Sequence, residues 1–175
     1  MHESELARFV LQVPDFPKPG VVFRDMTPLL ASPPALALAV ELMANPYRGK
    51  GVELVIGAES RGFIFGTAIA QALSAGFVPV RKPGKLPREV RGMDYALEYG
   101  ADRLEIHADA VRPGQRVLLV DDVLATGGTM NAKCHLMAEM GAQVMGITVL
   151  IELPALAGRA RLGAHGANVH AVMKF

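Results

Sequence analysis

Residues 117–129 constrain the fold more strongly than any other part of the chain. Residues 117–120 are four consecutive apolar residues, which predicts a strand buried on both faces of a sheet. A buried strand ends in two carboxylates only where it leaves the core. We therefore expect Asp121 and Asp122 at the carboxyl end of this strand, facing a cleft.

The residues after this acid pair favour an anion site at the start of a helix. Small side chains, two adjacent glycines and two hydroxyls come from Ala125, Thr126, Gly127, Gly128 and Thr129. A glycine turn before a helix directs several backbone N–H groups to one point, and the helix dipole adds partial positive charge, so the pattern predicts a phosphate site. The carboxylates are acceptors and suit the hydroxyl donors of a sugar. The alternative is an ordinary turn with a threonine cap, although such a turn requires neither the acid pair nor both threonines.

Other phosphate-binding motifs fit the chain less well. Gly57 and Gly62 have the spacing of a Walker loop, but Phe63 follows where that loop requires lysine. No G-x-G-x-x-G pattern follows a predicted strand. As a thirteen-residue pattern, the run 117–129 instead resembles the ribose-5-phosphate loop of the type I phosphoribosyltransferases.

Length and composition limit the class of protein. The chain of 175 residues has room for one domain with a full core, and 51% of its residues are hydrophobic. A net charge of +1 gives no electrostatic reason to expect nucleic acid or an anionic membrane as partner. The single cysteine, Cys134, excludes an internal disulfide and is expected to be a small buried side chain. The apolar stretches are short and the N-terminus lacks a signal-type core, so we expect a soluble, cytoplasmic protein.

Strand and helix patterns alternate along most of the chain. Helices are predicted at residues 4–13, 34–44, 63–75, 130–140 and 156–162, strands at 21–25, 52–56, 77–80, 117–120, 144–151 and 169–173, and a hairpin at 95–99 and 104–107. This order predicts an α/β fold, with a central, mostly parallel, twisted sheet flanked by helices and a ligand site beyond the carboxyl ends of the strands. The proline-rich arm 14–20 and the last segment are expected to form a small cap over that edge.

A second loop at the same edge joins a predicted strand to a helix. Its backbone N–H groups and the side chain of Arg61 would make a second anion site, whereas the alternative has Ser60 as a helix cap and Arg61 on the surface. The segment Glu59, Ser60, Arg61 and Gly62 resembles the pyrophosphate loop of the same enzymes. That resemblance implies a strained peptide bond near Glu59–Ser60, for which the cis conformation is one possibility.

Residues 81–92 form a basic loop with glycines at two positions. Arg81, Lys82 and Lys85 would neutralise a pyrophosphate, and Gly84 and Gly92 favour a lid that closes over the site. The alternative is a solvated hairpin rich in charge. Residues 85–87 resemble the flexible loop of the family, while residues 88–93 match no part of its pattern.

Two further segments resemble the adenine phosphoribosyltransferase family in particular. Residues 96–100 resemble the far side of its flexible loop, where Glu98 is the candidate general acid for a proton at N7 of adenine. The alternative for Glu98 is an exposed strand residue. Residues 14–17 and 20–25 resemble the family's hood, in which extended backbone offers a C=O and an N–H to the edge of adenine. The adenine-binding residues are then Val22, Phe23, Arg24 and Leu153, with Phe23 stacking on the base; the alternative is that residues 21–23 are simply core.

The resemblance covers residues 14–162 and implies an activity. The expected reaction transfers the 5-phosphoribosyl group from phosphoribosyl pyrophosphate to adenine, giving AMP and pyrophosphate in purine salvage. Mg²⁺ is expected to bind through substrate and water, with no direct protein ligand. A homodimer is implied, with Arg81 reaching the partner's site. The chain is expected to be one domain, 1–175, with an arm and hood at 1–32 and an α/β core at 33–175 that carries the lid at about 81–95.

Two other functions remain open from the sequence. One is the same transfer to another purine, such as xanthine or hypoxanthine. A 6-oxo purine favours a donor such as lysine near the base, and residues 22–24 do not obviously supply one. The other is a non-catalytic regulator that binds phosphoribosyl pyrophosphate. Such regulators usually add a DNA-binding domain, for which this chain has neither the length nor a basic patch.

Overall fold

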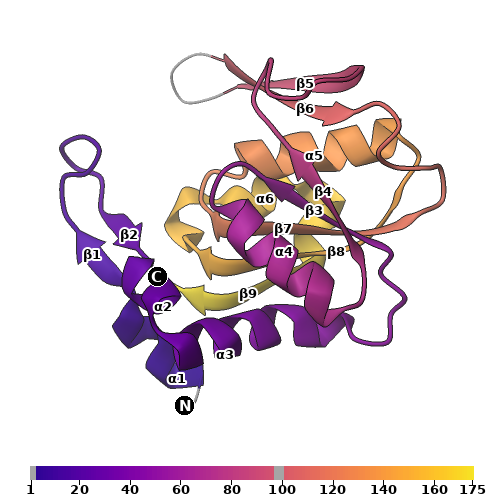
Figure 1. The fold of residues 1–175 in the computed structure, drawn as a ribbon. Coiled ribbons are helices and arrows are strands. Elements are labelled where there is room, and N and C mark those ends of the chain that lie inside the picture. The colour runs from indigo at the N-terminus through magenta and orange to yellow at the C-terminus, as the bar shows by residue number, and fades with distance from the viewer. Residues whose placement is uncertain (1–2, 97–100) are drawn as a thin grey trace.

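A five-stranded parallel sheet lies at the centre of the fold (Figure 1). The computed structural model describes residues 3–96 and 101–175. The strand order is β4-β3-β7-β8-β9, and every neighbouring pair is parallel. The strands are β3 (Leu54–Ala58), β4 (Gly76–Val80), β7 (Arg116–Leu124), β8 (Gln143–Glu152) and β9 (Val169–Lys174). The predicted α/β fold with a parallel sheet is therefore confirmed.

Helices cover both faces of this sheet (Figure 1). The α-helices are α1 (Glu3–Leu6), α2 (Thr27–Ala31), α3 (Pro33–Ala44), α4 (Gly62–Ala72), α5 (Gly128–Glu139) and α6 (Gly158–Arg161). The short 3₁₀ helices are η1 (Ala7–Phe9), η2 (Asn45–Tyr47), η3 (Pro154–Leu156) and η4 (Gly163–Asn168). Both α2 and α3 carry proline in the first turn, where the missing N–H has no helical partner to lose. In the described part of the chain, no helix combines the length and apolarity needed to cross a bilayer.

The central strand β7 divides the core into two clusters. Leu118 and Val120 lie in the cluster that contains residues of α3 and α4, and Val117 and Leu119 lie in the cluster that contains residues of α5. This alternation is the two-residue period of a strand buried on both sides. It continues into the acid pair, so the two carboxylates are expected to leave β7 toward different helices. Cys134 is buried in the α5 cluster, as expected.

Two small antiparallel sheets flank the central one (Figure 1). One is a hairpin formed by β5 (Val90–Ala96) and β6 (Ala101–His107), which packs over α5. A hairpin was predicted here, but its first strand begins at Val90 rather than at residue 95, because residues 90–96 pair with 101–107, and residues 97–99 of the predicted strand lie outside the described residues. A bridge between Arg81 and Glu105 joins it to the end of β4. The other sheet pairs β1 (Leu11–Val13) with β2 (Phe23–Asp25) and projects from the body of the molecule.

Three other sequence predictions need correction. The predicted helix 4–13 is wrong beyond residue 9, because residues 11–13 pair with β2 and the residue before Pro14 is disfavoured in a helix. The strand predicted to end at residue 120 continues to Leu124, because β8 pairs with it over that length. Finally, the last strand is not part of a cap: β9 is an edge strand of the central sheet.

Candidate active site

The loops after β3 and β7 open at the same edge of the sheet. The pairing of β3 with β7 ends at Gly57 and Val120, while β7 continues alongside β8. A cavity of about 260 Å³ lies there, and its walls come from the two predicted loops: Glu59, Ser60, Arg61, Asp121, Asp122, Val123, Ala125 and Thr129. A smaller hollow of about 80 Å³ adjoins it and is lined by residues that include 123–130. The structure therefore brings the two predicted anion loops together.

The loop before α5 has the geometry of an anion cradle. Gly127 is the residue before the first helical turn and has a φ of 80°, a left-handed conformation that favours glycine. Gly128 begins α5, and no side chain caps the N-terminus of the helix. Gly127 and Gly128 are buried, Ala125 and Thr129 are half-buried, and Thr126 is exposed. The first N–H groups of the helix thus remain available to a ligand.

The two carboxylates lie inside β7 and are almost fully buried, with 8% of Asp121 and 5% of Asp122 exposed. Asp121 accepts a hydrogen bond of 2.8 Å from Nζ of Lys133 on α5. The other oxygen of Asp121 accepts one of 3.1 Å from the N–H of Asp122. Asp122 instead faces Arg61, with 2.7 Å between Oδ2 and Nε. The acid pair therefore has one cation on each side.

Asp122 retains an unused acceptor. Its Oδ2 atom is buried and close to Arg61, yet no N–H is aligned with it for a hydrogen bond. Burial raises the pKa of Asp122 to about 7, the charge of Asp121 adds to that shift, and Arg61 opposes it. A ligand hydroxyl would satisfy this oxygen, as expected for a sugar-binding carboxylate.

The second loop follows β3 directly. The Glu59–Ser60 peptide is cis, which confirms the form that the resemblance allowed. The carboxylate of Glu59 accepts a hydrogen bond of 2.6 Å from the N–H of Lys82 and lies 3.3 Å from Nε of Arg81. Although burial opposes the shift, these partners hold the pKa of Glu59 below its ordinary value. Glu59 therefore fastens the start of the basic loop to the second anion loop.

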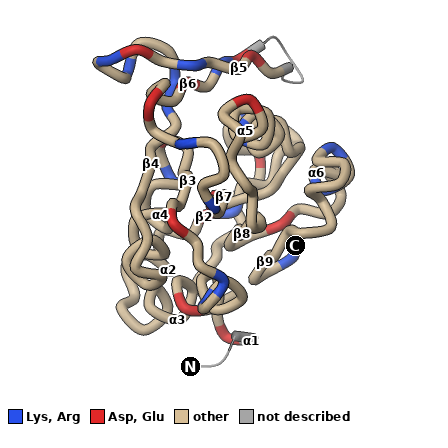
Figure 2. The backbone as a smooth tube through the Cα atoms, turned by 90° about the vertical axis from the view of Figure 1, so that its right-hand side faces the viewer, with Lys and Arg blue, Asp and Glu red and all other residues tan. Residues whose placement is uncertain are grey.

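The other predicted pyrophosphate cations do not line the cavity. Nζ of Lys82 donates to Asp102 and, at 3.1 Å, to the hydroxyl of Tyr95, so its charge is held by the hairpin. Lys85 is exposed, and its carbonyl accepts from Arg81 at 3.4 Å. Figure 2 shows lysine and arginine interspersed with acidic residues along the β5–β6 hairpin. Of the predicted cations, Arg61 alone lines the described part of the cavity.

The β1–β2 sheet, the predicted hood, meets the loop after β3 through an aromatic ring. The guanidinium of Arg61 lies 5.2 Å from the ring centre of Phe23, and Phe16 packs edge-on against the same ring at 5.1 Å. Val22 is 45% exposed. The predicted stacking residue is thus beside the cavity wall.

Two other predicted base-site residues lie near the ends of strands. Arg24 lies over the ring of Phe175 at 4.7 Å, and its Nε and Nη1 atoms are buried without a hydrogen-bond partner. Leu153 is half-buried, and its N–H donates to the carbonyl of Leu124. Glu98, the candidate acid, lies outside the described residues.

Comparison with known proteins agrees with this geometry. The model of the phosphoribosyl transferase domain family matches residues 26–165. An adenine phosphoribosyltransferase from Rhodopirellula baltica is 52% identical over 171 residues, which cover 98% of this chain and 82% of the relative. The chain belongs to the adenine phosphoribosyltransferase family. Its fold is accordingly the type I phosphoribosyltransferase fold.

Solved structures of this family superpose over almost the whole chain. The adenine phosphoribosyltransferase of Thermoanaerobacter pseudethanolicus has a TM-score of 0.95 and 45% identity, covering 99% of this chain and 100% of that one. The enzyme of Saccharomyces cerevisiae has a TM-score of 0.91 and 35% identity, covering 98% of each chain. It was solved with an imino-altritol bisphosphate and adenine.

Two residues near the loop before α5 were missed by sequence reasoning. Lys133 looked like an ordinary residue of a helix with mixed polarity, yet its side chain is fully buried. Gly158, at the start of α6, packs its backbone against the loop: a Cβ at this position would overlap the carbonyl of Ala125 and lie 3.0 Å from the N of Gly127. Neither has a local sequence signal, because the partners of Lys133 lie 12 and 13 residues earlier on β7 and those of Gly158 lie in the loop before α5.

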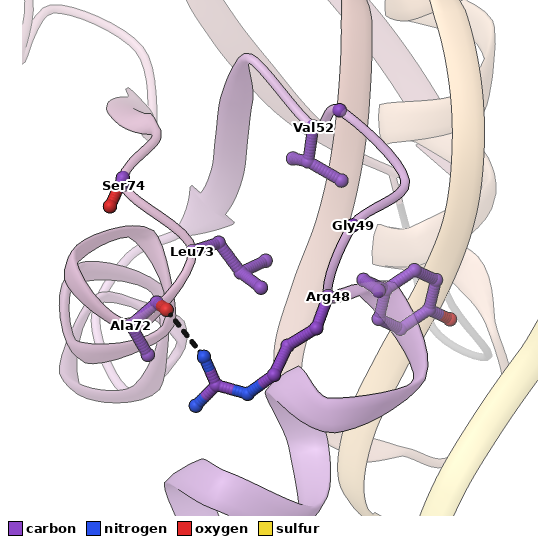
Figure 3. A pocket seen from close by; sticks show the side chains of 8 residues that line it. Arg48, Gly49, Val52, Ala72, Leu73 and Ser74 are labelled. Atoms are coloured by element: carbon purple, nitrogen blue, oxygen red, sulfur yellow. Dashed lines mark hydrogen bonds between the residues drawn. The ribbon is translucent and has the colours of Figure 1, made fainter.

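A separate cavity of about 430 Å³ lies near the amino ends of β3 and β4, away from the loop before α5 (Figure 3). Arg48 lines it and donates a hydrogen bond of 2.9 Å to the carbonyl of Ala72. The same guanidinium forms an ion pair with Glu41. Because this charge is already paired, the cavity offers much less to an anionic substrate than the edge with the two anion loops.

Proposed function

We propose that the chain transfers the 5-phosphoribosyl group of phosphoribosyl pyrophosphate to adenine, giving AMP and pyrophosphate. The observation that carries this proposal is the single cavity shared by two anion loops and a buried acid pair. Family membership and the adenine complex of the yeast relative support the choice of base. The reaction belongs to purine salvage and makes the chain a pentosyltransferase.

The ribose 5-phosphate half would bind at the start of α5. The 5-phosphate lies against the backbone N–H groups and the two hydroxyls of residues 125–129, where the helix dipole also favours an anion. The ribose hydroxyls donate toward the acid pair, and Oδ2 of Asp122 supplies the free acceptor. The negative charge of Asp121 also stabilises the oxocarbenium character that develops at the anomeric carbon, and Asp122 adds to it once the pH exceeds its raised pKa of about 7.

The pyrophosphate half would bind at the second loop. Ser60 and Arg61 receive it directly, because both line the cavity. Glu59 contributes by holding the start of the basic loop. Arg81, Lys82 and Lys85 complete the site when the lid closes, which requires Lys82 to exchange Asp102 for pyrophosphate oxygens.

The base would bind between the hood and the start of the segment after β8. Phe23 stacks on adenine, Leu153 covers its other face, and the backbone of Val22 and Arg24 pairs with its amino donor and ring acceptor. Adenine would react as its N7–H tautomer: N9 attacks the anomeric carbon as the bond to pyrophosphate breaks, and the electron pair of that bond leaves with pyrophosphate. Glu98 accepts the proton from N7 in this direction and returns it in the reverse direction.

Magnesium fits this site as a companion of the substrate. Among residues 3–96 and 101–175, no group of three metal-ligating side chains is present. Oδ2 of Asp122, which is ion-paired with Arg61 but accepts no hydrogen bond, would suit a metal-bound water as an alternative to a ribose hydroxyl. Bound Mg²⁺ would neutralise charge on pyrophosphate and so help it to leave.

The assembly, the location and the domain division of the chain belong to the same proposal. We infer a homodimer in which Arg81 reaches the partner's site, and a cytoplasmic location. We also infer one domain over residues 1–175, divided into an arm and hood at 1–32 and a core at 33–175 with the lid at about 81–95. The separate pairing of β1 with β2 supports the hood in this division.

Product formation tests the proposed reaction. The purified chain is incubated with adenine, phosphoribosyl pyrophosphate and Mg²⁺, and AMP and pyrophosphate are quantified. We expect both in equal amounts, with far less turnover by a folded Asp122→Asn variant. If phosphoribosyl pyrophosphate binds but no base is converted, the non-catalytic regulator is the correct reading instead.

A further inference from the structure

Lys133 is a buried cation that the proposed reaction does not use. Its side chain is 0% exposed on α5, and its helical neighbours Met130, Leu136 and Met137 are buried apolar residues. Nζ donates two hydrogen bonds of 2.8 Å, one to the carbonyl of Val120 and one to Oδ2 of Asp121. Removing a lysine from water is costly unless its charge is paired, so this placement needs a specific partner.

The partner is the acid pair of the site rather than a surface group. Lys133 lies on the helix whose first turn is the phosphate loop, and Asp121 lies on the strand that carries the ribose-binding carboxylates. The two hydrogen bonds therefore join the two halves of the ribose 5-phosphate site. Apolar contacts already pack α5 against the sheet, so the ion pair adds a fixed orientation to that packing.

The two carboxylates consequently have different hydrogen-bonding roles. Oδ2 of Asp121 is taken by Lys133, and Oδ1 by the N–H of Asp122, so Asp121 cannot rotate without breaking one of them. Asp122 keeps Oδ2 free of hydrogen bonds. Lys133 thus acts on the ligand through Asp121, from beneath the site.

We propose that Lys133 is a positioning residue that holds the acid pair in register with the phosphate loop. This inference rests on the proposed function, since it assumes that the cavity binds ribose 5-phosphate. Because Lys133 lies under the acid pair and not in the loop, its loss should weaken the binding of the sugar and leave the binding of phosphate almost unchanged.

Titration with two probes tests this separation. Calorimetry or ³¹P NMR gives the affinities for ribose 5-phosphate and for inorganic phosphate. For Lys133→Met we expect ribose 5-phosphate to bind roughly tenfold more weakly and phosphate to change less than about twofold. Met137→Leu, a volume-conserving change of a buried residue one turn further along α5, is the matched control and should leave both affinities unchanged. Equal loss for both probes, or no loss for either, would overturn the proposal.

A double-mutant cycle tests whether Lys133 acts through Asp121. We expect Asp121→Asn, Lys133→Met and the double variant to lose similar affinity for ribose 5-phosphate, because they disable one unit. Losses that multiply in the double variant contradict this. If Lys133→Met fails to fold, the double variant is compared with Asp121→Asn instead, because the double variant buries no unpaired charge. Similar affinities of these two variants for ribose 5-phosphate support the proposal. An affinity of the double variant that is roughly threefold or more weaker than that of Asp121→Asn overturns it. If the native chain binds neither probe, the proposed function itself fails.

Discussion

At the scale of single residues, the two adjacent carboxylates differ in what they can offer a ligand. Both oxygens of Asp121 are engaged within the protein, whereas Oδ2 of Asp122 lies beside Arg61 without an aligned donor. Burial and the neighbouring charge raise the pKa of Asp122 to about 7. Two acids of the same type therefore carry different properties because each faces a different helix.

The raised pKa of Asp122 makes a prediction about stability and pH. Between the ordinary value of 3.8 and about 7, the folded chain keeps a proton on Asp122 that the unfolded chain has released. Proton binding therefore stabilises the fold in this window, and stability is lost as pH rises through it. We expect the free energy of unfolding to fall more steeply between these pH values in the native chain than in Asp122→Asn. Urea unfolding across that range measures the difference, and identical pH dependence in both proteins would contradict it.

Glu98 carries the prediction about proton transfer. Glu98→Gln keeps the shape and hydrogen-bonding reach of the side chain but removes its titrating proton. We expect kcat to fall roughly 10²- to 10⁴-fold with little change in KM for either substrate, the span usual for one acid–base group. Steady-state kinetics and a pH profile that loses one limb check this. A folded variant with native kcat would leave Glu98 as an ordinary hairpin residue.

At the scale of elements, the loop 125–129, the proposed phosphate site, packs against a segment about thirty residues further along the chain. The backbone at the start of α6 packs directly against the backbone of this loop. The approach is so close that a Cβ on Gly127 would lie 2.6 Å from the carbonyl of Gly158. Arg159 anchors α6: its guanidinium binds both carboxylate oxygens of Glu152 at 2.8 and 2.6 Å and also donates to the carbonyls of Gly166 and Val169. The loop is thus supported from behind by a fixed structure.

Gly158→Ala tests this support. The added methyl group would meet the carbonyl of Ala125, which belongs to the loop. We expect affinity for phosphoribosyl pyrophosphate to fall roughly tenfold or more, with a stability loss of about 1–3 kcal/mol from overpacking. Gly76→Ala is the control, because its methyl group would meet mainly the end of the Leu54 side chain at the other end of the sheet. Unchanged affinity in Gly158→Ala would mean that the loop does not depend on α6.

Elements with a strong local pattern were predictable, and elements set by remote partners were not. The run 117–129 indicated its strand, turn and helix, because each is encoded by neighbouring residues. The extension of β7 to Leu124 depends on pairing with β8, and β1 forms where a helix was predicted because β2 lies beside it. The burial of Lys133 and the contact of Gly158 likewise depend on residues elsewhere in the chain.

At the scale of the whole molecule, the strand order of the sheet places the two predicted anion loops and the acid pair at one edge. The parallel strands β3 and β7 are neighbours, so their following loops share a cavity. The β5–β6 hairpin and the β1–β2 hood lie on either side of the central sheet (Figure 1). Alternating strands and helices made this edge predictable, whereas the salt bridges that hold the basic loop to Glu59 and Asp102 required the structure.

The choice of base is the most direct test of the proposed activity. Equal concentrations of adenine, hypoxanthine, guanine and xanthine compete for limiting phosphoribosyl pyrophosphate with Mg²⁺, and the nucleotide products are separated and quantified. A site that pairs with the amino edge of adenine leaves polar groups unpaired with a 6-oxo purine, so we expect AMP to exceed each other product by roughly 10²-fold or more. Comparable amounts of a 6-oxo purine nucleotide would contradict an adenine phosphoribosyltransferase activity.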